Sequence, residues 1–391
     1  MSCFSRSACP RLVRGLLLMV GALAAGLGAT GFAQAAPYRP ADPAEVLERL
    51  PVSAAPRSLQ GRRLSADQAA ELARVFIERG RSSGDPRELG YAQGVLAPWW
   101  SAADAPDRVL LLRATLRQAR HDFDGALADL ARLLARRPED AQAWLTQATV
   151  LRVLGRYDEA RRSCAELQGR TEPFIAALCA AAVQGLHGEA TQASAALEAL
   201  APALSGQSPG VAAWYYAERA ELAERLGQRV VAERWYRQAL IRVPDDHGLR
   251  AAYADLLLDD RRAPEVLALI DADVTAEALM LRRALALQAL GDPQFAALDL
   301  RIRDNFDAAR RRGEPLHLRE EARYALARGE TALALTLARQ NWAVQHEPWD
   351  ARLLLVAAMA AGQPQAASTV RDWLRATGLQ DARLTHAGGA P

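Results

Sequence analysis

GRYDEA, residues 155–160, stands between two apolar helical runs, with Trp144 eleven residues before its glycine. A short polar corner between two helices is typical of a helical hairpin, where glycine adopts backbone angles that other residues resist. Similar corners begin at residues 121, 155, 188, 227, 261, 291, 329 and 362. Their successive spacings are 34, 33, 39, 34, 30, 38 and 33 residues. A period near 34 residues predicts a stack of helix–turn–helix repeats.

Small residues keep fixed distances from these corners. Seven residues before each of the first seven corners the chain has Ala114, Ala148, Ala181, Ala220, Ala254, Ala284 and Ala322. Five residues after it are Ala126, Ala160, Ala193, Ala232, Val266, Ala296 and Ala334. Small side chains at both places would let the two helices of a hairpin approach closely. Larger residues are expected to fill the space toward the next unit: Leu130, Leu133, Leu197, Leu200, Tyr236 and Leu300. His121 and Arg261 take the corner position in their units.

The unit around GRYDEA resembles the tetratricopeptide repeat (TPR) superfamily. The residues that carry the resemblance are Trp144, Ala148, Gly155, Tyr157 and Ala160, with a proline after the second helix of other units at Pro138 and Pro244. The resemblance covers about residues 107–376. It implies an all-α, right-handed solenoid whose first helices line a concave surface, and a non-enzymatic protein that binds a protein or peptide partner.

The rest of the chain divides around this array. Residues 1–35 have the basic n-region, apolar stretch and Ala-x-Ala site of a signal peptide, with cleavage expected after Ala35; a retained anchor is the alternative. Residues 36–64 form a proline-rich extended leader. A capping-box pattern at Ser65 and Gln68 and a first-turn Pro86 predict a degenerate helix pair at 65–106. TPR-like repeats follow at 107–347, then a divergent C-terminal capping repeat at 348–380 and a flexible tail at 381–391.

Composition removes several function classes. The chain has no lysine, which excludes lysine-nucleophile chemistry. Its net charge of +2 becomes about −1 when Arg6, Arg11 and Arg14 leave with the signal, so nucleic-acid binding is not expected. The histidines and cysteines form no metal-ligand spacing and no glycine loop suits a phosphate, so neither metal nor cofactor is expected. Gly206-Gln207-Ser208-Pro209-Gly210 matches G-x-S-x-G, but without a preceding strand we interpret it as a loop between repeats.

The concave face supplies the candidate binding residues. Mapping the first helix of each unit gives Thr115, Gln118, Gln142, Thr149, Arg152, Trp214, Glu218, Glu221, Arg225 and Asp255, with ordinary surface residues as the alternative. Trp214 is the candidate anchor for a peptide. Glu218 and Glu221 have no acid/base partner geometry, so no catalytic residue is expected. Cys164 and Cys179 lie on helices expected to pack together, and either a disulfide or two small core residues would fit.

These observations predict a periplasmic, non-enzymatic scaffold that binds a protein or peptide partner in its concave groove, with no membrane span after signal cleavage. The alternative is a membrane-anchored envelope component of a polysaccharide or outer-membrane export or assembly machine. The two hypotheses differ in whether the mature protein begins near Ala36.

Overall fold

The computed structural model describes residues 64–311 and 317–386, and within these ranges it contains helices and no β-strand. The predicted all-α fold is therefore confirmed. The signal peptide and the leader fall on residues 1–63 and lie outside the described residues. Among the described helices, none combines the length and the hydrophobicity that crossing a membrane requires.

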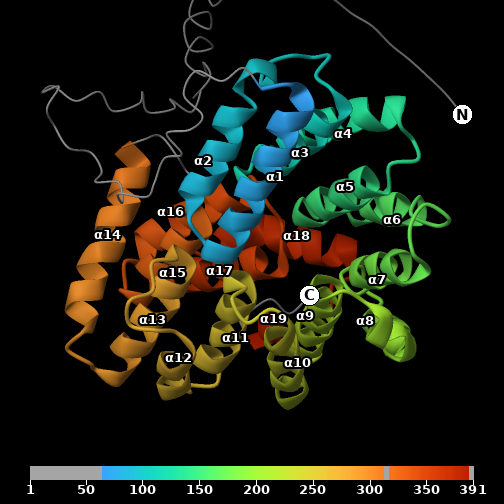
Figure 1. The fold of residues 1–391 in the computed structure, drawn as a ribbon. Helices are drawn as coiled ribbons and strands as arrows, with labels where there is room; N and C mark the ends of the chain where they lie inside the picture. The colour runs from blue at the N-terminus through green and yellow to red at the C-terminus, as the bar shows by residue number, and fades with distance from the viewer. Residues whose placement is uncertain (1–63, 312–316, 387–391) are drawn as a thin grey trace, which may run out of the picture.

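Consecutive helices pack in pairs along the chain as helical hairpins (Figure 1). The pairs in the described residues are α1 (Ala66–Ser83) with α2 (Pro86–Val95), α3 (Asp107–Ala119) with α4 (Phe123–Arg136), α5 (Ala141–Val153) with α6 (Tyr157–Ala165), α7 (Pro173–Gln184) with α8 (Ala190–Leu200), α9 (Pro209–Arg225) with α10 (Arg229–Arg242), α11 (His247–Asp259) with α12 (Ala263–Leu269), α13 (Glu277–Leu290) with α14 (Phe295–Arg311), α15 (Leu318–Ala327) with α16 (Thr331–Trp342), and α17 (Pro348–Ala360) with α18 (Ser368–Thr377). A final helix, α19 (Ala382–His386), follows them.

Local signals fix several helix starts. The predicted capping box begins α1, where the Gln68 N–H donates to Ser65 Oγ at 3.3 Å and the Ser65 N–H donates to Gln68 Oε1 at 3.1 Å. Ser208 likewise caps α9 by accepting a hydrogen bond from the Val211 N–H at 3.4 Å. The G-x-S-x-G match therefore lies between two helices, as predicted, and its serine has a structural role.

The corners have the expected left-handed backbone. Gly155 has φ +68°, and the two non-glycine corners, His121 and Arg261, are held at φ +58°. Because a side chain at positive φ is strained, these two positions show that packing of the hairpins imposes the turn even where glycine is missing.

Both columns of small residues are buried, with one exception. Each alanine of the first column is at most 2% exposed, and the second column is equally buried except at Ala296. There α14 turns Ile302, Phe306 and Ala309 toward the core instead, which leaves Ala296 and Leu300 exposed. The prediction that Leu300 fills the core is therefore wrong, because α14 begins four residues after its corner at Gly291, whereas α4 and α6 begin two residues after theirs, and this shifts the helix register.

A disulfide joins Cys164 on α6 to Cys179 on α7, with their Cα atoms 5.6 Å apart. It connects two neighbouring hairpins and encloses a separation of 15 residues. A bridge of that loop length adds roughly 3 kcal/mol in the chain-entropy model.

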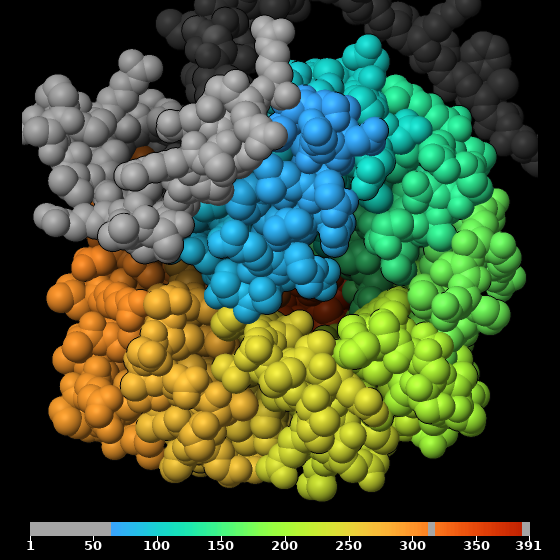
Figure 2. Space-filling view, viewed as in Figure 1, coloured from blue at the N-terminus to red at the C-terminus, as the bar shows by residue number. Residues whose placement is uncertain are grey.

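The array bends until its first hairpin reaches α11, so the molecule is a ring with a central hollow (Figure 2). The first hairpin lies against a later one: α1 contacts α11, and a Cβ built on Gly84 would lie 2.8 Å from the Cβ of Ala276. On the inner side, the His346 N–H donates to the Val153 carbonyl at 2.7 Å. The concave face of this solenoid is therefore enclosed by its own chain.

The C-terminal residues pack inside the ring. Leu353, Leu354 and Leu355 of α17 share one hydrophobic core with Tyr157 and Ala148 of the α5–α6 hairpin. The residues expected to cap the outer end of the array thus contact its inner side instead. Residues 381–386, expected to belong to a flexible tail, include α19, which packs against α9 and α17.

Candidate functional site

A cavity of about 760 Å³ occupies the centre of the ring. Figure 2 shows a hollow at the centre of the ring, with C-terminal residues, in red, visible behind it. Six of the predicted binding residues line it: Thr115, Gln118, Gln142, Thr149, Arg152 and Trp214. The sequence therefore identified one wall of a real cavity, formed by the inner faces of α3, α5 and α9.

The wall formed by α3 and α5 presents neutral polar groups. The Thr115 and Thr149 hydroxyls each donate to a carbonyl of the preceding helical turn at 3.0 Å, which leaves their oxygens able to accept hydrogen bonds. The Gln142 amide donates weakly to Thr146 Oγ1 at 3.4 Å. Gln118 adds a second amide, so this wall can both donate and accept.

Arg152 and Trp214 are oriented by one carboxylate. Arg152 donates to both oxygens of Glu218, at 2.8 and 3.2 Å, and the Trp214 indole N–H donates to Glu218 Oε1 at 2.9 Å. Burial would raise the pKa of Glu218, but the charge and hydrogen bonds of Arg152 outweigh it and hold that pKa below its ordinary value. Glu218 is thus a buried, ionised residue that positions two cavity residues. The expectation that its carboxylate is open to a partner is corrected.

The opposite wall comes from the end of the chain. Arg319 of α15 pairs with Asp350 at 2.6 Å and with Glu347, and Arg319 and Glu347 line the cavity. His121 faces them across the ring; burial, followed by the charge of Arg319, lowers the pKa of His121 to about 4. The sequence analysis missed this wall because the helices that form it lie far from α3 along the chain.

Glu221 lies one turn beyond Glu218 on the inner face of α9 and keeps 47% of its side chain exposed. Its nearest cation is Arg225, 4.0 Å away. Enclosure by the ring, followed by the charge of Glu218, raises the pKa of Glu221 to about 7. Near neutral pH this carboxyl therefore exists in both protonation states.

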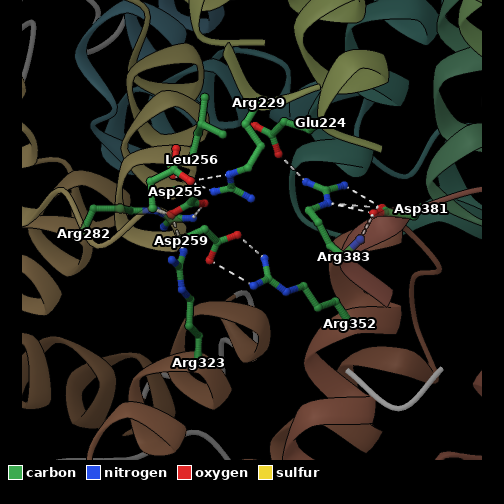
Figure 3. Close-up of polar contacts among 11 residues, drawn as sticks. Glu224, Arg229, Asp255, Leu256, Asp259, Arg282, Arg323, Arg352, Asp381 and Arg383 are labelled. Atoms are coloured by element: carbon green, nitrogen blue, oxygen red, sulfur yellow. Dashed lines mark hydrogen bonds and ion pairs between the residues drawn. The ribbon is translucent and has the colours of Figure 1, made fainter. Parts of the chain in front are cut away.

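Two further predicted residues are covered by their own chain. Asp255 is 4% exposed and accepts hydrogen bonds from Arg282 at 2.8 Å and from Arg323 at 2.6 Å (Figure 3). These arginines outweigh the effect of burial and hold the pKa of Asp255 below its ordinary value. Arg225 is also 4% exposed and borders a different cavity. The predicted binding residue Asp255 is therefore paired within the chain, and its carboxylate is not open to a partner.

The C-terminal helices pair with two further carboxylates, on α11 and α9. Arg352 of α17 donates to both oxygens of Asp259 at 2.5 and 2.9 Å, and Arg383 of α19 donates to Glu224 at 2.5 Å (Figure 3). These pairs join residues 93 and 159 positions apart in the sequence. Because the partners are so far apart in the sequence, the residue spacing within α9 and α11 could not predict these ion pairs.

The chemistry of the cavity depends on which of its side chains are already paired. In the described ranges no group of three or more His, Cys, Asp or Glu side chains is placed to hold a metal ion. The carboxylates that line the cavity, Glu320 and Glu347, pair with Arg282 and Arg319. The lining also offers hydroxyl, amide and indole groups to a ligand in a partly open volume.

No protein-family model matches this sequence, and no curated protein matches it closely enough to count as a relative. Among solved structures, a thermophilic TPR protein from Thermus thermophilus is 21% identical, with a TM-score of 0.40, and covers 50% of this chain and 100% of its own. A tetratricopeptide repeat protein from Parabacteroides merdae is 13% identical, with a TM-score of 0.36, over 78% of this chain and 98% of its own. The TPR domain of P58(IPK) is 16% identical, with a TM-score of 0.25, over 82% and 96%.

At these values the comparisons carry no argument about this chain. Features of the chain itself resemble tetratricopeptide repeats: helical hairpins that stack in sequence order, corners at positive φ, and buried alanines seven residues before each of the first seven corners.

Proposed function

We propose that this tetratricopeptide-type solenoid is an exported, non-enzymatic scaffold that holds an extended segment of a protein partner in its central cavity. The single observation that carries the proposal is the polar wall of α3 and α5 facing a cavity of about 760 Å³. That volume is within the range of about 300–1,000 Å³ in which ligand sites fall.

The chemistry of the wall favours a peptide main chain. An extended peptide offers alternating N–H and C=O groups, and the threonine oxygens and glutamine amides can pair with both. Trp214 offers an aromatic face beside them, held in place by its hydrogen bond to Glu218 at 2.9 Å. The paired arginines and carboxylates around the cavity would keep it close to neutral.

Export rests on residues 1–35, whose pattern supports a cleaved signal peptide and a periplasmic location. The rival, an envelope component of an export or assembly machine anchored by an uncleaved N-terminus, has no residue in the described part of the chain in its favour. N-terminal sequencing of the protein purified from cells separates the two. A start at Ala36 supports the soluble scaffold, and a start at Met1 in the membrane fraction contradicts it.

The binding proposal is tested by site-specific photocrosslinking in intact cells. A photoreactive amino acid is placed at Gln118, inside the cavity, and at Ala131, an exposed outer residue of α4, as the matched control. We expect one partner to crosslink at Gln118 and not at Ala131, and Trp214→Ala to weaken that crosslink. Equal capture at both positions, or capture unaffected by Trp214→Ala, would contradict the cavity as the site.

A further inference from the structure

Residues 368–386, at the end of the described chain, comprise α18, a short connection and α19, and are called the C-terminal strap below. The strap runs across three successive hairpin corners. A Cβ built on Gly155 would lie 2.7 Å from the Trp373 indole nitrogen, and one on Gly188 would lie 3.2 Å from the Gly378 carbonyl oxygen. One on Gly227 would lie 3.4 Å from the Cβ of Ala382. Absence of a side chain at Gly155 and Gly188 is what allows the close approach there.

The strap buries fewer apolar side chains than the helix before it. α17 buries Leu353, Leu354 and Leu355 in the core, whereas α18 buries only Val370 completely. The opposite face of α18 is exposed, including Asp372 and Arg375. The strap is thus an amphipathic segment whose few buried apolar side chains, Val370, Leu379 and Leu384, join the same core as α17.

The contact between the strap and the array is incompletely packed. A second cavity, of about 840 Å³, lies between the end of α9, at Arg225 and Leu226, and strap residues 374–384. Two polar atoms at this contact are buried without a hydrogen-bond partner in the described structure: Tyr157 Oη and Trp373 Nε1. Buried polar groups left unpaired cost free energy, so they weaken this contact relative to a well-packed core.

The strap's own residues identify the chemistry that the surface accepts. Trp373 lies against Tyr157, with ring centroids 6.0 Å apart. Further along the strap, Arg383 donates to Glu224, an acidic residue of α9. Between them lie the side-chain-free corners and the apolar edge of the second cavity. This surface therefore takes an aromatic residue at one end and a cation at the other.

We propose that the surface beneath the strap is a second docking surface, for a basic amphipathic helix of a protein partner that displaces the strap. The strap of the chain itself competes for the surface. The apparent affinity for the partner is therefore the intrinsic affinity multiplied by the fraction of molecules in which the strap has left. This surface is separate from the central cavity, and the proposal does not depend on what that cavity binds.

The first test uses the full chain and a fluorescent peptide with the sequence of residues 366–386. In the variant Trp373→Ala/Arg383→Ala the internal competitor is weakened, and we expect the peptide to bind it about tenfold or more tightly than the unmodified protein by fluorescence anisotropy. Asp372→Ala, on the exposed face of α18, is the matched control and should bind the peptide like the unmodified protein.

A peptide carrying the same two alanines should fail to bind the double variant. If the double variant binds the original peptide no better than the unmodified protein does, the proposal is overturned. Circular dichroism of the double variant establishes that the array is intact, and photocrosslinking at Gln118 is expected to be unchanged, which separates this test from that of the cavity.

The second test needs no substitution. Hydrogen exchange of the unmodified protein should show residues 368–386 opening as one unit, at least about tenfold more often than α17. Exchange of the strap at the rate of Leu353 to Leu355 would mean that it opens only with the core, and would overturn the proposal.

Discussion

Two hairpins of the same type, α5–α6 and α17–α18, have side chains of different size at the same position of the repeat. Both have a glycine corner at almost the same φ, +68° at Gly155 and +67° at Gly362. Seven residues earlier, however, the first has Ala148 and the second has Leu355, and both are 1% exposed. In the first hairpin a small side chain lets the helices pack closely against their sequence neighbours. In the second a large side chain fills the space inside the ring.

The difference teaches how the two kinds of contact are encoded. α5–α6 packs against α4 and α7, its neighbours in the chain, through a small residue that recurs in every regular unit. α17–α18 reaches the α5–α6 hairpin itself and α11, through Leu355, Arg352 and Trp373. Residues that depart from the repeat are those that close the ring.

The largest expected effect comes from removing the bulk that the closing hairpin supplies. Leu355→Ala should leave a cavity in the ring's core and lower the free energy of unfolding by about 2–5 kcal/mol, measured by chemical denaturation. Met359→Ala on the same helix, where the side chain is 53% exposed, is the control and should change stability by less than about 0.5 kcal/mol. Equal effects at both positions would show that α17 is not held in the core.

The converse substitution in the regular hairpin should cost less. Ala148→Leu overpacks the contact between α5 and its neighbours and should destabilise the protein by about 1–3 kcal/mol. Ala131→Leu, on the exposed side of α4, supplies the control. An unchanged denaturation midpoint for Ala148→Leu would contradict the repeat register and, with it, the comparison of the two hairpins.

The same contrast decides what could be predicted from sequence. The hairpins, their corners and the first column of alanines follow from contacts between residues less than about 40 positions apart, which a repeating pattern records. The half of the cavity formed by α3, α5 and Trp214 follows from it as well. Two features depend on how far the array bends: the cavity wall at Arg319 and Glu347, and the pairing of Asp255. The spacing of the repeats does not predict that curvature.

An ion pair from each hairpin gives a finer test. Arg352 and Asp259, at 22% and 17% side-chain exposure, join the closing hairpin to α11, whereas Arg156 and Glu159 form an exposed pair within one helical turn. We expect a double-mutant cycle with Arg352→Met and Asp259→Asn to give a coupling of about 1 kcal/mol, because the pair is largely enclosed. The cycle with Arg156→Met and Glu159→Gln should give about 0–0.5 kcal/mol. Equal couplings would mean that the closing contact is no more enclosed than the surface.

The smallest effect concerns pH and lies where the two hairpins approach α9. Glu221 faces Glu218 and Arg225 of its own helix, Arg152 of α5, and Glu347 at the start of α17. Its pKa is raised from 4.5 to about 7, so the folded protein holds a proton that the unfolded chain releases between those values. This group's contribution to stability therefore falls as pH rises through that window and is constant above and below it.

The glutamine of Glu221→Gln cannot ionise, so the variant should lack that pH dependence. The free energy of unfolding of the variant, compared with that of the unmodified protein, should therefore be higher at pH 8 than at pH 5. The difference should be less than about 1 kcal/mol, since the half-exposed side chain is screened by water. Glu78→Gln, an exposed change on α1, is the control for the substitution itself. Thermal unfolding at both pH values measures the difference. If Glu221→Gln keeps the pH dependence of the unmodified protein, the Glu221 carboxyl is not enclosed by the α17–α18 hairpin. The interior of the ring would then be more open to water than the contact of α17 with α5–α6 implies.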